Sequence, residues 1–238
     1  MVGSLLPLTV RDAEVRRRGQ RLIGPIDLVL DGQGVTVLIG PNGAGKSTLL
    51  QMMHGINRFS RGTLDWAVPA IEARARQAFV FQTPVMMRRS VQDNLAYPLR
   101  LRGASRTEAR RAAQAWCARI GLSGAETRAA TVLSRGEKQK LALARALITA
   151  PELLFLDEPS ASLDGRATRE IEALLLAAVA DGTRVVMATH DMGQARRVAR
   201  DVIFLRGGLV HETGLAPAFF DAPQTAEARA FLAGDIVE

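Results

Sequence analysis

The sequence has little of what stabilises secreted proteins or crosses membranes. Cys117 is the single cysteine among 238 residues, so no disulfide can form within the chain. No run of 18 or more apolar residues offers a membrane-spanning helix. The start, Met1–Pro7, lacks the basic and apolar regions of a signal peptide. We therefore expect a chain that works in the cytosol and a Cys117 thiol that is buried and reduced.

Lysine and aromatic residues are also scarce. The formal net charge is +7, with only three lysines, and aromatic residues make up 5% of the chain. A basic surplus attracts nucleic acid or an anionic membrane face. Proteins that bind nucleic acid, however, often stack aromatic side chains on the bases, and this chain has few of them. We expect no nucleic-acid partner and interpret the arginines, which occur throughout the chain, as a solvated surface; nucleic acid is the alternative.

The most specific motif is the stretch Gly-Pro-Asn-Gly-Ala-Gly-Lys-Ser-Thr, which follows the apolar run Val35–Ile39. It fits the phosphate-binding pattern G-x-x-x-x-G-K-[ST] between a buried strand and a helix. Glycines let the backbone N–H groups and the start of the helix point at a phosphate. Lys46 is expected to reach the β- and γ-phosphates, and Ser47 to take a position on Mg²⁺. The expected nucleotide-binding residues are Gly40, Pro41, Asn42, Gly43, Ala44, Gly45, Lys46, Ser47 and Thr48.

Hydrophobic periodicity and turn residues divide the chain into a strand-rich part, a helical part and a second strand-rich part. The expected strands are 8–10, 26–30, 35–39, 63–66, 78–81, 153–156, 184–189, 202–205 and 208–210. The expected helices follow Lys46, open at the capping boxes 90–93, 105–108 and 134–137, and form a tail to Glu238. The pattern predicts an α/β fold: a P-loop NTPase core with a mixed or parallel sheet, an antiparallel β edge region and a helical subdomain insert. We expect one domain, 1–238, with core segments 1–83 and 134–238 and the insert at about 84–133.

Two carboxylates, Asp157 and Glu158, come directly after the apolar run 153–156. The carboxyl end of a parallel strand is where ligands bind in open α/β sheets. Asp157 suits a metal ligand, acting directly or through water, and Glu158 suits a general base that polarises an attacking water. The alternative is an ordinary acidic turn. His190 follows the strand 184–189 and could, on its own, be a structural histidine.

The motifs together resemble those of the ATP-binding cassette (ABC) ATPases. The resemblance rests on the loop 40–48, Gln82, Leu133-Ser-Arg-Gly-Glu137, Leu156-Asp-Glu-Pro159, Ser162-Leu-Asp164 and His190, in that order over essentially the whole chain. It implies that the chain binds ATP with Mg²⁺, and that two copies close head to tail around two ATP molecules.

The same resemblance implies roles for individual residues. Ser134 and Gly136 would contact the γ-phosphate held by the opposite subunit, and Asp164 would line the seam between the two copies. Gln82 would touch the metal and the attacking water, and His190 would hold the γ-phosphate. Glu158, His190 and Gln82 are thus the expected catalytic residues, and Ser47, Gln82 and Asp157 the expected metal ligands.

The chain departs from the family pattern at two places. Arg135 stands where the signature usually has its first glycine, and Glu137 stands where it usually has glutamine. The family often stacks adenine on an aromatic residue about two dozen residues before the phosphate loop. That place falls near Val15–Arg17, which has no aromatic side chain. An arginine could stack on the base instead.

The resemblance further implies an ATPase subunit of a transporter on the cytoplasmic face of the membrane. The pore would be a separate permease chain, served by an extracytoplasmic solute-binding protein. Segments 81–90 and 94–103 look like those of oxyanion importers, tungstate in particular. The alternatives are a ribosome- or DNA-associated ABC ATPase and the cassette of an exporter. Met86 and Met87, in the segment 84–89, are expected to face the permease; alternatively, they fill the core of the insert itself.

Overall fold

A central sheet and a smaller second sheet organise the computed structural model, which describes residues 4–235. The first three residues and the end of the expected helical tail lie outside that range. The strands are β1 (Leu8–Arg17), β2 (Gln20–Leu30), β3 (Val35–Ile39), β4 (Arg61–Trp66), β5 (Gln77–Val80), β6 (Leu153–Asp157), β7 (Arg184–Ala188), β8 (Asp201–Arg206) and β9 (Leu209–Leu215). The helices are α1 (Lys46–His54), α2 (Ala70–Ala75), α3 (Val91–Leu101), α4 (Arg106–Arg119), the 3₁₀ turn η1 (Ala130–Val132), α5 (Arg135–Leu147), α6 (Gly165–Ala180), α7 (Met192–Val198), α8 (Ala216–Asp221) and α9 (Ala226–Ala233).

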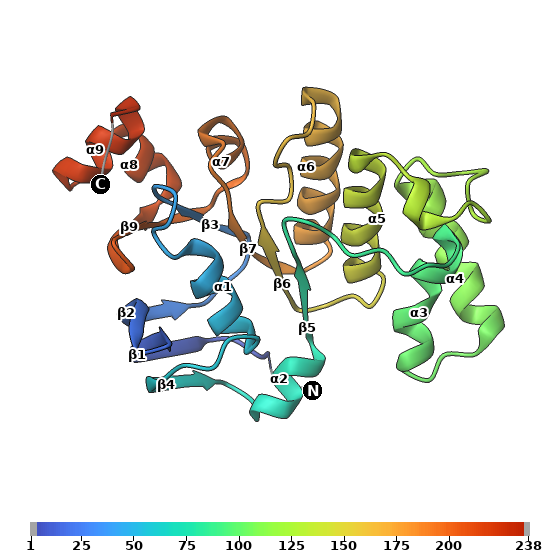
Figure 1. Ribbon diagram of the computed structural model, residues 1–238, viewed down its shortest axis with the longest axis horizontal. Helices are drawn as coiled ribbons and strands as arrows, with labels where there is room; N and C mark the ends of the chain where they lie inside the picture. The colour runs from blue at the N-terminus through green and yellow to red at the C-terminus, as the bar shows by residue number, and fades with distance from the viewer. Residues whose placement is uncertain (1–3, 236–238) are drawn as a thin grey trace.

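The central sheet has six strands in the order β5-β6-β7-β3-β8-β9. Its first five strands pair in parallel, and β9 pairs antiparallel with β8. The carboxyl ends of β5, β6, β7 and β3 therefore meet at one edge of the sheet, as the figure shows (Figure 1). This is the edge where ligands bind in open α/β sheets.

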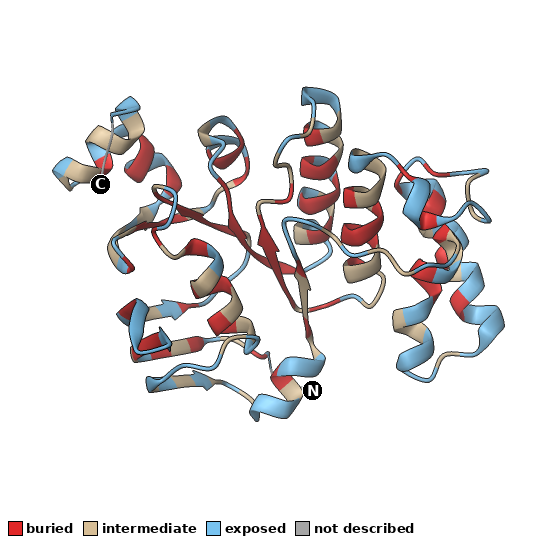
Figure 2. Ribbon diagram, viewed as in Figure 1, coloured by how far each residue is buried: buried red, intermediate tan, exposed pale blue. Residues whose placement is uncertain are grey.

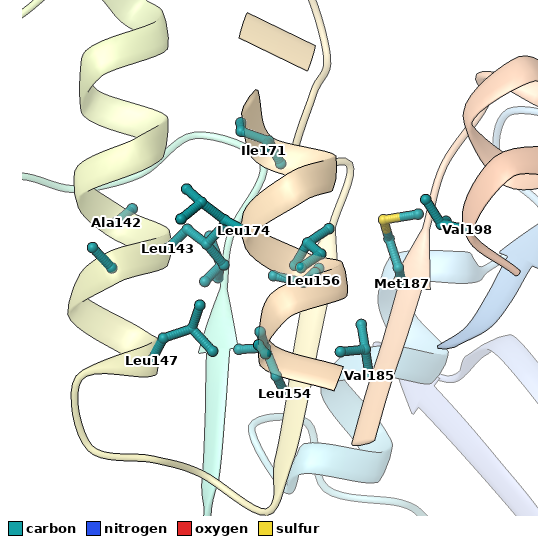
Figure 3. Close-up of a cluster of buried hydrophobic side chains, with 14 of the residues drawn as sticks. Ala142, Leu143, Leu147, Leu154, Leu156, Ile171, Leu174, Val185, Met187 and Val198 are labelled. Atoms are coloured by element: carbon teal, nitrogen blue, oxygen red, sulfur yellow. The ribbon is translucent and has the colours of Figure 1, made fainter. Parts of the chain in front are cut away.

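Both faces of the central sheet are buried, because β6 sends alternate side chains into two different hydrophobic clusters. Leu153 and Phe155 belong to the cluster that contains α1 and the small sheet. Leu154 and Leu156 belong to the cluster that contains α5, α6 and α7. Figure 3 shows the second cluster, with Ile171 of α6 among its members. The sheet is thus covered on both sides, as its continuous apolar strands predict.

The small sheet is antiparallel, in the order β2-β1-β4. Figure 2 shows buried and exposed residues mixed along β1 and β2 and no buried residue in β4, unlike the fully buried strands β3, β6 and β7. Its inner face packs on α1 through residues such as Leu8 and Ile23. The α/β class with a mixed sheet and an antiparallel edge region is therefore confirmed.

Residues 84–133 leave the central sheet and form α3, α4 and η1 at one end of the molecule (Figure 1). Ser90 caps α3, and Ser105 and Glu108 form a complete capping box on α4. The buried side of α4 includes Ala113 and Cys117, which belong to the same cluster as α5 and α6. Cys117 is buried, as expected, and this burial raises the pKa of its thiol to about 11.

Three helices lie in segments for which the periodicity predicted no element: α2, α6 and α7. The helix that opens at the capping box 134–137 begins at Arg135 and ends at Leu147, as that box predicts for its start. Strands β1 and β2 extend beyond the expected runs 8–10 and 26–30, and the added residues include the buried Ala13, Val15 and Ile23, which are separated from those runs by polar residues or by Gly24 and Pro25. Within residues 4–235 no helix is long and apolar enough to cross a membrane.

Candidate active site

The loop between β3 and α1 is held close to the sheet by glycine. A Cβ atom on Gly40 would collide with the backbone oxygen of Leu205, and one on Gly45 would collide with the side chain of Ile23. Gly45 also has φ = 101° and is the N-cap of α1, where no side chain bonds the first N–H groups. The start of α1 therefore keeps free donors for an anion, with the positive end of the helix dipole behind them.

Lys46 is almost fully buried at the start of α1, with 7% of its surface exposed. Its ammonium group donates to the carbonyl oxygens of Gly40 at 2.7 Å and Pro41 at 2.9 Å. Burial lowers the pKa of Lys46, while the charges of Glu158 and Asp157 act to raise it. The ammonium is thus aimed into the loop, where it can exchange carbonyl oxygens for phosphate oxygens.

The side chains of Asp157 and Ser47 are hydrogen-bonded, because Asp157 lies on the face of β6 that packs against α1. Asp157 continues the row of Leu153 and Phe155, whose side chains face α1, and the Ser47 hydroxyl donates to its carboxylate at 2.8 Å. Burial raises the pKa of Asp157, and the Ser47 bond partly opposes that rise. A hydroxyl beside a buried carboxylate is a pair of oxygen ligands of the kind that Mg²⁺ binds together with phosphate oxygens.

Glu158 turns away from Asp157, and its backbone is left-handed with φ = 46°. Its N–H still donates to Ala188 of β7 at 2.9 Å, so the neighbouring strand holds this uncommon conformation. The Oε2 atom of Glu158 accepts from the Gln82 amide at 3.0 Å and lies 3.1 Å from Nδ1 of His190. The side chains that follow β5 and β7, Gln82 and His190, therefore both contact the carboxylate of Glu158, which follows β6.

These residues line one cleft of about 540 Å³, here named the nucleotide cleft. Its lining residues are Asn42, Gly43, Gly45, Lys46, Ser47, Thr48, Gln82, Glu158 and His190. Asp157 lies behind this lining, bonded to Ser47. The cleft holds all the groups needed to bind a polyphosphate and to activate a water beside it: helix N–H donors, a cation, hydroxyls and a carboxylate with two polar neighbours.

A buried polar network that the sequence did not reveal positions the loop of His190. Gln194 has no exposed surface; it accepts from Ser160 at 2.8 Å and Thr189 at 3.1 Å. Thr189 accepts in turn from the N–H of Asp191, so both neighbours of His190 are fixed. The sequence signal was the spacing from the N-cap Asp191 to Gln194, which resembles a capping box at the start of α7.

Ser134, Gly136 and Asp164 do not line the nucleotide cleft. They line a separate pocket of about 370 Å³, here named the signature pocket. Its lining residues are Ser134, Arg135, Gly136, Glu137, Lys140, Ser162, Leu163, Asp164, Arg166, Ala167 and Glu170. Ser134 and Glu137 form a complete capping box on α5, and Asp164 caps α6 by accepting from Ala167 at 2.8 Å. Two helices therefore begin at this pocket, and both are capped by their own side chains.

The two departures from the signature pattern are both visible in the structure. Arg135 is exposed at the first position of α5 and lines the signature pocket. The Glu137 carboxylate accepts from the Ser134 N–H at 2.7 Å and completes the capping box, so it does here what a glutamine would do. Residues Val15–Arg17, at the expected adenine position, lie at the end of β1, where Arg17 is exposed.

Comparison with known proteins agrees with this geometry. A family model described as ABC transporter matches residues 23–161, which include the phosphate loop, the signature segment and both carboxylates. The chain belongs to the ABC transporter family. It is thus an ATP-binding ATPase whose family couples ATP hydrolysis to transport. The resemblance stated from the motifs is confirmed at this level.

Several curated relatives are similar over most of this ABC chain. The tungstate uptake system ATP-binding protein TupC of Peptoclostridium acidaminophilum is 34% identical over 221 residues, covering 90% of this chain and all of that protein. A probable anion import ATP-binding protein of Haloferax volcanii is 33% identical over 234 residues, covering 89% and 81%. The taurine import ATP-binding protein TauB of Escherichia coli K12 is 34% identical over 220 residues, covering 91% and 84%.

Solved structures of the family share the fold. The structure of cbiO1 from Clostridium perfringens, described as part of the ABC transporter complex cbiONQ, superposes with a TM-score of 0.80 at 26% identity, covering 94% of each chain. A second structure, described as the ATP-binding subunit of an ABC transporter, has a TM-score of 0.82 at 24% identity and covers 96% of this chain and all of that one. These matches confirm the α/β fold expected for the chain.

Proposed function

We propose that this chain is the ATP-hydrolysing subunit of an importer for small oxyanions such as tungstate. It acts at the cytoplasmic face of the membrane as a head-to-tail dimer that is attached to separate permease subunits. An extracytoplasmic solute-binding protein delivers the solute to that permease. The observation that carries the ATPase part is the convergence of Gln82 and His190 on Glu158 beside the phosphate loop. The names of the relatives, which include tungstate, anion and taurine import proteins, support import of an anion.

In this proposal the residues of the nucleotide cleft act on ATP and one water molecule. The N–H groups at the start of α1 and the Lys46 ammonium hold the β- and γ-phosphates. Glu158 accepts a proton from the water as the water oxygen bonds to the γ-phosphorus. The bond between the γ-phosphorus and the bridging oxygen breaks, which leaves ADP and phosphate. Gln82 and His190 orient the Glu158 carboxylate and the water before the reaction.

Mg²⁺ is the metal that these residues fit. Ser47 and Asp157 offer a hydroxyl and a carboxylate 2.8 Å apart, and Gln82 offers an amide oxygen at the other side of the cleft. Bound there with the nucleotide, Mg²⁺ would neutralise charge on the phosphate oxygens. Asp157 gains from such a charge, because burial without a cation raises its pKa and disfavours the ionised form.

The separation of the two pockets supports a dimer. Within one chain, Ser134 and Asp164 lie in the signature pocket, away from the phosphate loop. If a second copy supplies them, its two helix N-termini and the Ser134 hydroxyl face the γ-phosphate. The hydroxyl oxygen of Ser134 is used by the N–H of Glu137, but its proton remains available for a phosphate oxygen.

A third pocket supports attachment to a permease. A groove of about 430 Å³ between the central sheet and the helical insert is lined mainly by apolar residues: Ala78, Phe79, Val80, Phe81, Pro84, Val85, Met87, Tyr97, Pro98, Leu101, Ala142, Arg145 and Ala146. Val85 and Leu101 are 77% and 69% exposed, which is unusual for such side chains. We name it the docking groove. It suits an apolar face of a short helix from the permease.

The two methionines of the segment 84–89 lie in different surroundings, which allows the attachment of the permease at the docking groove to be tested. Met87 lines the docking groove, whereas Met86 packs against the main hydrophobic cluster. Met87→Glu should therefore fold and hydrolyse ATP as an isolated subunit but fail to co-purify with the permease, because a charge enters an apolar groove. Met86→Glu, the matched variant, should lower the melting temperature, since its carboxylate replaces core packing.

Co-purification of membrane proteins with a tagged chain tests both the role of Met87 and the importer proposal. Recovery of a permease with a solute-binding protein supports import, and transport assays with tungstate and other oxyanions then identify the solute. Recovery of ribosomes or DNA instead would favour a non-transport ATPase, and a permease without any binding protein would favour an exporter. Unchanged permease recovery with Met87→Glu would rule out the docking groove as the attachment site.

A further inference from the structure

The positive charge of this protein is concentrated in the helical insert. Residues 84–133 hold nine arginines, no lysine and three carboxylates, a net charge of +6 out of the +7 of the whole chain. The remaining 188 residues carry 22 basic and 21 acidic side chains and are nearly neutral. Arginines occur throughout the chain, as the sequence indicated, but the unbalanced ones gather at the end of the molecule formed by α3 and α4 (Figure 1).

Six of the nine arginines are exposed and have neither an ion pair nor a side-chain hydrogen bond within residues 4–235. They are Arg88, Arg89, Arg100, Arg106, Arg110 and Arg111. The other three have structural partners. Arg102 bonds two backbone carbonyls, Arg119 pairs with Asp181, and Arg128 pairs with Glu137. Arg111 lowers the pKa of Glu108 through its charge, whereas no partner is found within residues 4–235 for the side chains of the other five.

The arginines of α4 occupy positions that weaken the helix. Arg106 is the first residue of α4, where a cation opposes the helix dipole. Arg110 lies one turn later, and like charges spaced i,i+4 repel each other. The single acidic residue of α4, Glu108, is already bonded to Ser105 in the capping box. Local stability therefore gives no reason for this pattern, which points to an anion outside the chain.

We propose that the outer surface of α3 and α4 binds the anionic headgroups of the lipid bilayer. This inference rests on the proposed attachment to a membrane permease. The docking groove is lined by Tyr97, Pro98 and Leu101 of α3, and α4 packs against α3. A permease seated in that groove would bring the arginines of the insert close to the bilayer. Arginine suits lipid phosphates because its planar guanidinium bonds two oxygens at once.

Lipid is favoured over two other anionic partners. Cytoplasmic loops of membrane proteins carry an excess of lysine and arginine, so a permease surface is not expected to complement six arginines. Nucleic-acid binders use aromatic side chains between the cations, whereas α4 offers one half-buried aromatic, Trp116, whose ring is already covered by Arg119. An anionic bilayer requires only the cations, each contributing a factor of about five in affinity.

Vesicle binding by the full chain, without the permease, tests the proposal. The purified protein is sedimented with vesicles of phosphatidylcholine alone or mixed with phosphatidylglycerol, at low and high salt. The combined variant Arg106→Gln, Arg110→Gln and Arg111→Gln should lower affinity for the anionic vesicles by a factor on the order of a hundred. The control Arg11→Gln, Arg58→Gln and Arg74→Gln removes the same charge from exposed arginines outside the insert. It should retain most of the binding.

The variants separate this proposal from the proposed function. The α4 variant should keep its ATPase rate, because no α4 residue lines the nucleotide cleft. Met87→Glu should keep vesicle binding even if it loses the permease. Equal losses in the α4 variant and the control would show only a general charge effect and overturn the proposal. Binding to transfer RNA that depends on α4, with vesicle binding unchanged, would replace lipid by nucleic acid as the partner.

Discussion

The nucleotide cleft and the signature pocket are both built at helix N-termini, but those termini are completed in different ways. At the nucleotide cleft, α1 begins at Gly45, with no side-chain cap and no acidic residue in its first turn. At the signature pocket, α5 and α6 begin at Ser134 and Asp164, and both are capped. The first helix leaves its N–H donors for a ligand, whereas in α5 and α6 the N–H of the third helical residue, Glu137 or Ala167, already bonds the capping side chain.

Because of this difference, the two regions are expected to bind a phosphate with different strength. A phosphate at α1 gains free donors and the Lys46 ammonium without breaking any cap. A phosphate at α5 gains the helix dipole, the Ser134 hydroxyl proton and the nearby Arg135, while the capping box stays in place. We therefore expect ATP to bind first to the nucleotide cleft of one chain. The signature pocket of a second chain then adds a weaker contact that depends on ATP being present.

The largest expected effect concerns the carboxylate of the nucleotide cleft. Glu158→Gln should lower the ATPase rate by about 10²–10⁴-fold, because the general base is lost while the amide keeps the contacts of Gln82 and His190. ATP affinity should stay unchanged, since Glu158 does not hold the phosphates. Steady-state hydrolysis and nucleotide titration measure the two quantities.

The same variant sharpens the comparison between the two regions. Without hydrolysis, ATP should hold two copies together through their signature pockets, and light scattering should report a dimer only when ATP is present. A rate close to that of the unmodified chain would remove Glu158 from the role of base. A monomer in saturating ATP would count against the head-to-tail arrangement.

The next effect separates binding from hydrolysis. Ser134→Arg should leave ATP binding to the isolated chain intact but lower hydrolysis at least about tenfold, because the ligand of Ser134 belongs to the other copy. Lys46→Ala should instead weaken ATP binding about tenfold or more through loss of a charge-assisted phosphate contact. A mixture of the two variants should form at most one working site in each mixed dimer.

Ser105 supplies the matched control, because it forms the same kind of capping box on α4. Ser105→Arg should lower stability by about 1 kcal/mol, as Ser134→Arg does, while its ATPase rate stays unchanged. If Ser134→Arg abolishes ATP binding by the isolated chain, the two-chain site is wrong. If both variants reduce the rate equally, loss of the cap alone explains the effect.

The smallest effect compares the aspartates of the two regions. Burial raises the pKa of Asp157, so its ionised form lowers the stability of the free protein. The folded chain holds this proton more tightly than the unfolded chain, so the stability contribution is full below the usual aspartate pKa. It is lost as pH rises through the higher folded pKa. Asp157→Asn should therefore raise the melting temperature at pH 7 by about 2–4 °C.

Asp164→Asn provides the contrast, because asparagine caps a helix as well as aspartate does. It should leave the melting temperature of the free chain almost unchanged at pH 7. The gain from Asp157→Asn should shrink as the pH falls below the usual aspartate pKa, and Mg²⁺ with ATP should stabilise that variant less than the unmodified chain. A lower melting temperature for Asp157→Asn at pH 7 would show that the carboxylate is stabilising in the free protein.

Much of the fold could be predicted from short-range patterns. The run Val35–Ile39 is the strand β3, residue for residue, because five apolar residues before a glycine loop leave few alternatives. The capping boxes at Ser105 and Ser134 form as predicted, since they depend only on residues three apart. The helix α6 was not predicted, although Asp164 caps it, because its third residue is Ala167 and the reciprocal half of a capping box is missing.

The sequence by itself predicted which residues bind a nucleotide, and it placed β3, β5, β6, β7 and β8 to within one residue at each end, because these features depend on neighbours in the chain. Tertiary structure alone decided how those residues are grouped. The parallel order of β5, β6, β7 and β3 brings Gln82 and His190 to Glu158, while Ser134 joins Asp164 elsewhere. It also set Met87 in a groove and Met86 against the main hydrophobic cluster, although they are adjacent in sequence. Such groupings depend on which strands pair and which faces pack, and those contacts join residues far apart in the chain.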